Sequence, residues 1–253
     1  MKLNFRKLGS GDPIFVLHGV FGSSDNWQTV GKNLSENFTV YLIDLRNHGQ
    51  SPHDSEMNYP AMAGDVLELI KDEKLDIVSI IGHSMGGKVA MELACSFPMV
   101  VKKLIVVDIA PKYYPPHHQD ILESFKTLAI QSMSTRKEAE EALSEKISNP
   151  GVRQFILKNL GRKDNDEFEW KINYQAISDN VELIGKGLEK NQRFNGQTLF
   201  INGSKSDYIQ KNDHELITSH FPKAQIKTIE GAGHWVHAEK PKEITTLLLN
   251  YLS

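Results

Sequence analysis

Ser84 lies at the centre of the pentapeptide "GHSMG", where an apolar run ends and an amphipathic run begins. A strand that turns sharply into a helix holds such a serine in a strained backbone conformation, and the glycines at 82 and 86 avoid clashes with the neighbouring strand and helix. The free N–H groups at the start of the helix favour negative charge on a bound carbonyl oxygen. An isolated G-x-S-x-G also occurs as a plain packing turn, so the neighbouring residues decide. In this position the pattern predicts a nucleophilic serine.

A serine hydroxyl is a weak nucleophile at neutral pH and requires a base within hydrogen-bond reach. His234 in "GAGHWVH" is the favoured candidate, because Gly231 and Gly233 leave its loop free to approach the turn. His237 competes, but its place at the start of the last predicted helix suits a structural histidine. His83 precedes the nucleophile, and we expect it to be a packed or orienting residue.

An oxyanion hole supplies backbone N–H groups to the developing negative charge. One predicted donor is Met85, directly after the nucleophile, and the second comes from the loop "LHGVFGS" after the first strong strand. Within that loop Val20 is favoured, with Phe21 as the alternative.

Other polar clusters carry less chemistry. Arg46, Asn47 and His48 follow a strand end and are interpreted as residues that hold a loop by hydrogen bonds. His117 and His118 lack the further ligands that a metal site requires, and we expect them to face solvent. Because the sequence contains no dinucleotide-binding fingerprint and no Walker loop, it predicts neither a metal nor a cofactor.

The elements that must position these residues alternate between strands and helices. Four nearly continuous apolar runs predict strands buried on both faces, as in a parallel sheet, and helical spacing fills the gaps between them. These runs are Ile14 to Gly19, Thr39 to Asp44, Asp76 to Gly82 and Lys103 to Ile109. The pattern predicts an α/β fold.

From about Tyr113 to Asn195 the alternation stops, and charged amphipathic helices follow with no convincing strand. A strand is predicted again at Gln197 to Gly203, then a helix near Asp213 to His220, a strand at "AQIKTIE" and a final helix "PKEITTLLLNYL". The segments before and after this region are both incomplete sheets. We therefore predict one domain over residues 1–253, with a helical cap inserted at about 113–195.

Composition excludes several classes of function. The 253 residues carry a net charge of −3 and 24% charged residues, so nucleic acid is not an expected partner. The first residues lack the apolar stretch of a secretory signal, and no segment is long enough to span a bilayer, which leads us to expect a cytoplasmic protein. The single cysteine, Cys95, lies in an apolar helical pattern and is expected to be buried.

Several motifs together resemble the α/β-hydrolase fold family, and in particular its branch of YbfF-type esterases and α/β-hydrolase domain 11 proteins. They are "HGVFGSSDNW", "DLRNHGQSP", "MNYPAMAGD", "GHSMGGKVAM", "VVDIAP", "GVRQFILKNL" and "GAGHWVHAEKP", and they extend over essentially the whole chain. The resemblance implies a mostly parallel central sheet flanked by helices, and activity on carboxylic esters or acyl-CoA thioesters.

The acid of the triad departs from the common pattern of this family. Most members place it after the strand that follows the cap, three residues beyond a glycine, where this chain has Ser206 and where Asp207 comes one residue late. Asp108 ends the strand expected beside the nucleophile strand, so its carboxylate lies on the same sheet edge as Ser84. Capping of a nearby loop is its competing role. We favour Asp108 as the acid and keep Asp207 as the alternative.

The sequence therefore predicts a serine hydrolase that acts on a small-molecule ester or thioester. Cap aromatics could line an acyl site or merely pack the cap, and packing is the commoner role for such residues. They are Tyr113, Tyr114, Phe125, Phe155 and Trp170. A carbon–carbon bond hydrolase with the same triad and a non-catalytic binding protein remain alternatives. The oligomeric state is not predicted.

Overall fold

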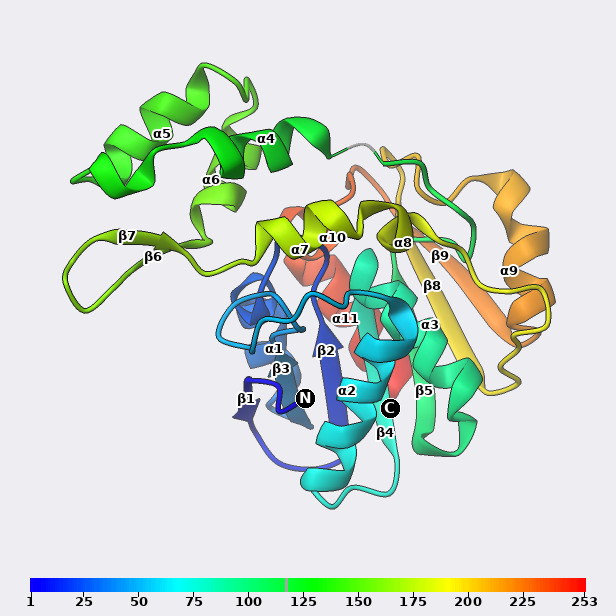
Figure 1. Ribbon diagram of the computed structural model, residues 1–253. Coiled ribbons are helices and arrows are strands. Elements are labelled where there is room, and N and C mark those ends of the chain that lie inside the picture. The colour runs from blue at the N-terminus through cyan, green and yellow to red at the C-terminus, as the bar shows by residue number, and fades with distance from the viewer. Residues whose placement is uncertain (117) are drawn as a thin grey trace.

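A seven-stranded sheet forms the centre of the computed structural model, which describes residues 1–116 and 118–253. The strand order is β1-β3-β2-β4-β5-β8-β9, and only β1 runs antiparallel to its neighbour (Figure 1). The strands are β1 (Phe5–Leu8), β2 (Pro13–Leu17), β3 (Thr39–Ile43), β4 (Val78–His83), β5 (Val101–Val107), β8 (Gln197–Gly203) and β9 (Ala224–Ile229). The predicted mostly parallel sheet is confirmed.

The apolar runs form strands because both faces of the sheet are covered. In β2, Ile14 and Val16 pack in one core and Phe15 and Leu17 in the other. Helices α1 (Gln28–Leu34) and α11 (Pro241–Leu252) contribute to the first core, while α2 (Tyr59–Asp72) and α3 (Met85–Ser96) contribute to the second. Two further helices, α9 (His214–His220) and α10 (Val236–Glu239), complete this part of the chain. This burial on both faces explains the absence of an alternating pattern.

Five helices of the segment predicted as a cap lie over one end of the sheet (Figure 1). In the sequence they follow β5 and precede β8. They are α4 (Gln119–Thr127), α5 (Arg136–Ser144), α6 (Pro150–Leu157), α7 (Tyr174–Asp179) and α8 (Val181–Gly185). We call residues 113–195 the cap segment. His117, one of the residues considered above, lies outside the described residues.

Three strands differ from the sequence prediction. The cap segment contains a short antiparallel hairpin, β6 (Leu160–Arg162) with β7 (Phe168–Trp170), where no strand was expected. Strand β1 at the sheet edge was also missed. Each of these strands has only three or four residues, which is too short for an apolar period to stand out. In the part of the chain that the structure describes, no helix has the length and apolar character needed to cross a bilayer.

Candidate active site

Ser84 lies between the end of β4 and the first residue of α3, as predicted for the nucleophile turn. Its φ is +52° and its ψ is −120°, a conformation that non-glycine residues rarely adopt. The glycines that flank it are required by space. A Cβ on Gly82 would lie 2.2 Å from the carbonyl oxygen of Gly86, and a Cβ on Gly86 would lie 2.5 Å from that of Leu17. The sharp turn therefore depends on glycine at both positions.

The structure brings Asp108, and not Asp207, to His234. Nδ1 of His234 donates a hydrogen bond of 2.7 Å to Oδ2 of Asp108. Asp108 directly follows β5 and is completely buried, whereas Asp207 is exposed. A carboxylate on Nδ1 fixes the tautomer of the neutral imidazole in which Nε2 is the proton acceptor.

Asp108 accepts two further hydrogen bonds, which fix its orientation. The backbone N–H of Gly203 donates to Oδ1 at 3.1 Å, and the hydroxyl of Ser206 donates to Oδ2. Position 206, where the resemblance led us to expect the acid, thus directs its side chain to the carboxylate of Asp108. Because this chain has a serine there, the position supplies a hydrogen bond to Asp108 in place of the carboxylate itself.

The ring and backbone of His234 are held from two sides. Nε2 of His83 donates to the carbonyl oxygen of His234 at 2.9 Å, and the ring of Tyr208 stacks on the imidazole at a centroid distance of 3.9 Å. His83 is therefore an orienting residue, as expected. His237 is buried and its ring stacks on that of Trp27 at a centroid distance of 4.5 Å. Burial, assisted by His234, lowers the pKa of His237 to about 3.

The predicted oxyanion loop is held by hydrogen bonds to its peptide groups. The carbonyl oxygen of Gly19 accepts from Nδ1 of His18 at 2.8 Å and from the N–H of Gly22 at 3.0 Å. Because a trans peptide directs its N–H opposite to its C=O, the N–H of Val20 is turned away from these donors. The N–H of Phe21 instead donates to Nε2 of His48 at 3.2 Å. Of the two candidates in this loop, Val20 is the one whose N–H is not engaged by His48.

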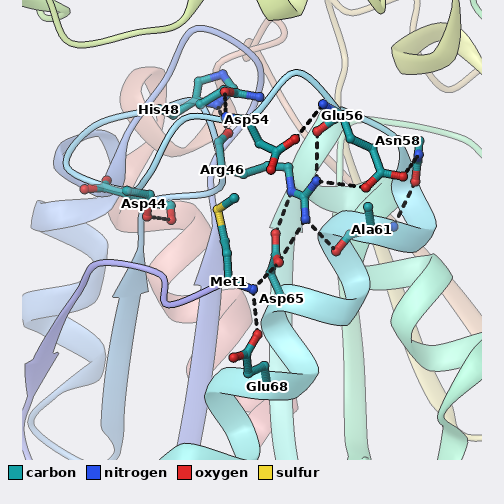
Figure 2. Close-up of polar contacts among 12 residues, drawn as sticks. Met1, Asp44, Arg46, His48, Asp54, Glu56, Asn58, Ala61, Asp65 and Glu68 are labelled. Carbon is teal, nitrogen blue, oxygen red and sulfur yellow. Dashed lines mark hydrogen bonds and ion pairs between the residues drawn. The ribbon is translucent and has the colours of Figure 1, made fainter.

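A buried ion pair supports the loop that carries His48. The guanidinium of Arg46 binds both carboxylate oxygens of Asp65 on α2, at 2.6 and 2.9 Å (Figure 2). Nδ1 of His48 donates to the carbonyl oxygen of Arg46 at 2.8 Å, so Nε2 is the acceptor for Phe21. Burial, together with the nearby His18, lowers the pKa of His48 to about 3. These residues hold the loop, as interpreted from the sequence.

Two cavities meet at Ser84. The first, which we call the Tyr114 cavity, is also lined by Met85, Lys88 and Tyr208. The second, the His234 cavity, is also lined by Phe21, Asn26, Phe155, Trp235 and His237. Val20, Ser84 and His118 line both. His118 is half-buried and its ring lies at a centroid distance of 5.4 Å from that of Phe21, so the expectation that it faces solvent is wrong.

Comparisons with known proteins identify the family of the chain. Residues 12–133 match a family model described as the alpha/beta hydrolase fold. The chain is 35% identical over 259 residues to the esterase YbfF of Escherichia coli, with all of both chains covered. It is 38% identical to the sn-1-specific diacylglycerol lipase ABHD11 of Danio rerio, over 96% of this chain and 80% of that protein. The chain belongs to the α/β-hydrolase family.

A solved structure described as a marine microorganism esterase superposes on this α/β-hydrolase with a TM-score of 0.96, at 44% identity and 99% coverage of both chains. The chain therefore belongs to a family of enzymes, and several of its relatives are named esterases.

One buried lysine of this α/β-hydrolase was not predicted from the sequence. Lys88 on α3 is only 2% exposed, and its Nζ donates to the carbonyl oxygens of Lys186, at 2.7 Å, and of Lys112. Burial, with a smaller effect from Lys112, lowers its pKa to about 7. The available signal was its place inside the apolar run "GGKVAM", where a charged side chain must find internal partners.

The cap aromatics of the α/β-hydrolase divide between the two expected roles. Tyr114 and Phe155 line the two cavities, whereas Phe125 is buried against Trp170 at a centroid distance of 4.8 Å. Tyr113 is 53% exposed and does neither. Among the residues the structure describes, no three histidine, cysteine or acidic side chains form a group able to hold a metal ion.

Proposed function

We propose that this α/β-hydrolase cleaves carboxylic esters or thioesters through an acyl-enzyme, with Ser84 as nucleophile, His234 as base and Asp108 as acid. The observation that carries the proposal is the 2.7 Å hydrogen bond from His234 to the buried Asp108, in a loop that shares a cavity with Ser84. The names of the relatives, an esterase and a lipase, support the same chemistry.

The reaction begins when Oγ of Ser84 attacks the carbonyl carbon while Nε2 of His234 accepts the hydroxyl proton. The resulting oxyanion accepts hydrogen bonds from the N–H groups of Met85 and Val20. His234 then gives its proton to the leaving oxygen or sulfur, and the bond between that atom and the acyl carbon breaks. Water, deprotonated by His234, then attacks the acyl carbon, the bond from that carbon to Oγ of Ser84 breaks, and Oγ takes the proton back from His234 as the acid leaves. Asp108 stabilises the imidazolium formed in both halves.

The two cavities give each half of the substrate a place. Since His234 must protonate the leaving group, the alcohol or thiol belongs in the cavity that His234 lines. The acyl chain then belongs in the Tyr114 cavity, against Ile109, Tyr114 and Ile184. These side chains offer an apolar wall, which selects acyl groups through differential binding of the transition state.

The test is the replacement Ser84→Ala, assayed with p-nitrophenyl acetate. We expect kcat to fall by about 10⁴-fold or more, with an unchanged melting temperature. A fluorophosphonate probe should label the wild-type protein at Ser84 and leave the variant unlabelled. Near-normal turnover by the folded variant would remove Ser84 from the mechanism. Absence of both turnover and labelling in the wild type would favour a binding protein.

A further inference from the structure

The peptide groups of Phe21 are held at both ends by buried side chains. Its N–H donates to His48, and its carbonyl oxygen accepts from Nδ2 of Asn159 at 2.8 Å. His48 belongs to the loop after β3, but Asn159 belongs to the cap segment, between α6 and β6. Asn159 is 3% exposed, so water does not readily replace this bond. The cap thus reaches a loop that lies 138 positions away in sequence.

Phe21 needs such support because of its backbone conformation. Its φ is +61°, a region that costs energy for a bulky non-glycine residue and that persists only where surrounding contacts enforce it. The ring is fixed from the cap as well, at a centroid distance of 5.7 Å from Phe125 on α4. Val20, the proposed oxyanion donor, is the residue directly before Phe21. The carbonyl of Phe21 shares its peptide with the N–H of Gly22, which donates to the carbonyl oxygen of Gly19, and that carbonyl shares its peptide with the Val20 N–H. Loosening the Phe21 carbonyl is therefore expected to displace the Val20 N–H.

We propose that Asn159 of the cap is a positioning residue for the oxyanion hole, so that the seated cap is required for turnover as well as for acyl selection. The inference rests on the proposed function. It assigns to the cap a part in stabilising the transition state, which an acyl-binding wall alone does not have. Asn159 acts through Phe21 and Val20 and does not itself touch the substrate.

Asn180 provides a matched control within the same cap. Its Nδ2 also donates to a backbone carbonyl outside the cap, that of Ser55, at 2.9 Å. The donor atom, the acceptor type and the bridge from cap to sheet domain are the same as for Asn159. Ser55, however, lies in the segment before α2 and lines neither cavity at Ser84. Replacing Asn180 weakens cap attachment without touching the oxyanion loop.

The experiment compares Asn159→Leu with Asn180→Leu on p-nitrophenyl acetate, whose acyl group is too small to use the cap wall. For Asn159→Leu we expect kcat to fall by about 10- to 100-fold, a part of the loss caused by removing an oxyanion donor outright, while KM stays within about twofold. A trifluoromethyl ketone, which forms an oxyanion on Ser84, should bind more weakly by the same factor as kcat/KM falls. Asn180→Leu should leave kcat, KM and inhibitor affinity within about twofold.

An equal fall in kcat for both variants, or a rise in KM with unchanged kcat, would overturn the inference. If Asn159→Leu does not fold, Asn159→Asp replaces it, because that change keeps the side-chain volume and removes the donor. The same loss of kcat is expected, and wild-type kcat would overturn the inference. Ser84→Ala separates the two proposals. An inactive Ser84→Ala beside a fully active Asn159→Leu refutes the role of Asn159 alone, whereas an active Ser84→Ala refutes the proposed function.

Discussion

Replacing Asp108 with asparagine tests which carboxylate serves His234. The amide keeps the acceptor for the N–H of Gly203, so the fold should survive. At Oδ2, however, an N–H group can replace the acceptor that now receives the proton of Nδ1 at 2.7 Å. His234 then adopts the tautomer with its proton on Nε2, which cannot accept a proton from Ser84. Holding the histidine in the wrong tautomer costs about 10⁴-fold in kcat, or about 5.4 kcal/mol.

The assay is p-nitrophenyl acetate hydrolysis by Asp108→Asn and Asp207→Asn side by side, with melting temperatures as a check on folding. Because Asp207 is exposed and Asp108 holds the histidine, Asp207→Asn should keep kcat within about twofold of wild type. A severe loss confined to Asp207→Asn would refute the assignment of the acid. Moderate losses in both would mean that either carboxylate can orient His234.

Two further predictions use neighbours of the triad. Adding Ser206→Asp to Asp108→Asn should recover at least about tenfold in kcat, since the side chain at 206 already meets the carboxylate that binds His234; no recovery would show that position 206 cannot orient the ring. The second prediction concerns His237, whose pKa is about 3 in the folded state, below its value of about 6.5 in the unfolded state. Between these values only the unfolded state binds the proton, so its stabilising effect is complete above pH 6.5 and is lost as the pH falls. From pH 7 to 5 the wild type should lose about 2 kcal/mol more unfolding free energy than His237→Phe in urea titrations, and equal losses would contradict the lowered pKa.

Much of the fold, and the residues proposed here as the triad, could be predicted from short stretches of sequence and simple rules of sheet topology. Strands buried on both faces give continuous apolar runs, and β8 was predicted with its observed ends, Gln197 and Gly203. The choice of Asp108 rested on a rule of parallel sheets, that carboxyl ends of neighbouring strands share one edge. The structure pairs β4 with β5, which places the residues that follow these strands, Ser84 and Asp108, side by side.

The rest depends on contacts between distant segments, which no local pattern reports. No sequence motif distinguishes Asn159 or Tyr208 from other polar residues. Their roles depend on contacts that form where the cap segment and the loop after β8 fold onto the turn that carries Ser84. The prediction of Val20 over Phe21 as the second oxyanion donor rested on a motif. The hydrogen bond from Phe21 to His48, which supports this prediction, is visible only in the structure. The strands of the β6–β7 hairpin are likewise too short to be recognised from the sequence.

The cap leaves and re-enters the sheet domain at a single place. The N–H of Leu188 donates to the carbonyl oxygen of Pro111 at 3.0 Å. Lys88 donates to one carbonyl group in each of the two connecting segments, those of Lys112 and Lys186. Segments whose ends lie together can be exchanged at little cost in loop-closure entropy. We therefore expect that residues 112–187, which make up most of the cap segment, can be replaced by the corresponding residues of a relative without moving β5 against β8. Such a chimaera would inherit the donor's acyl preference, but it would turn over at full rate only if the new cap also brought an amide to the carbonyl of Phe21.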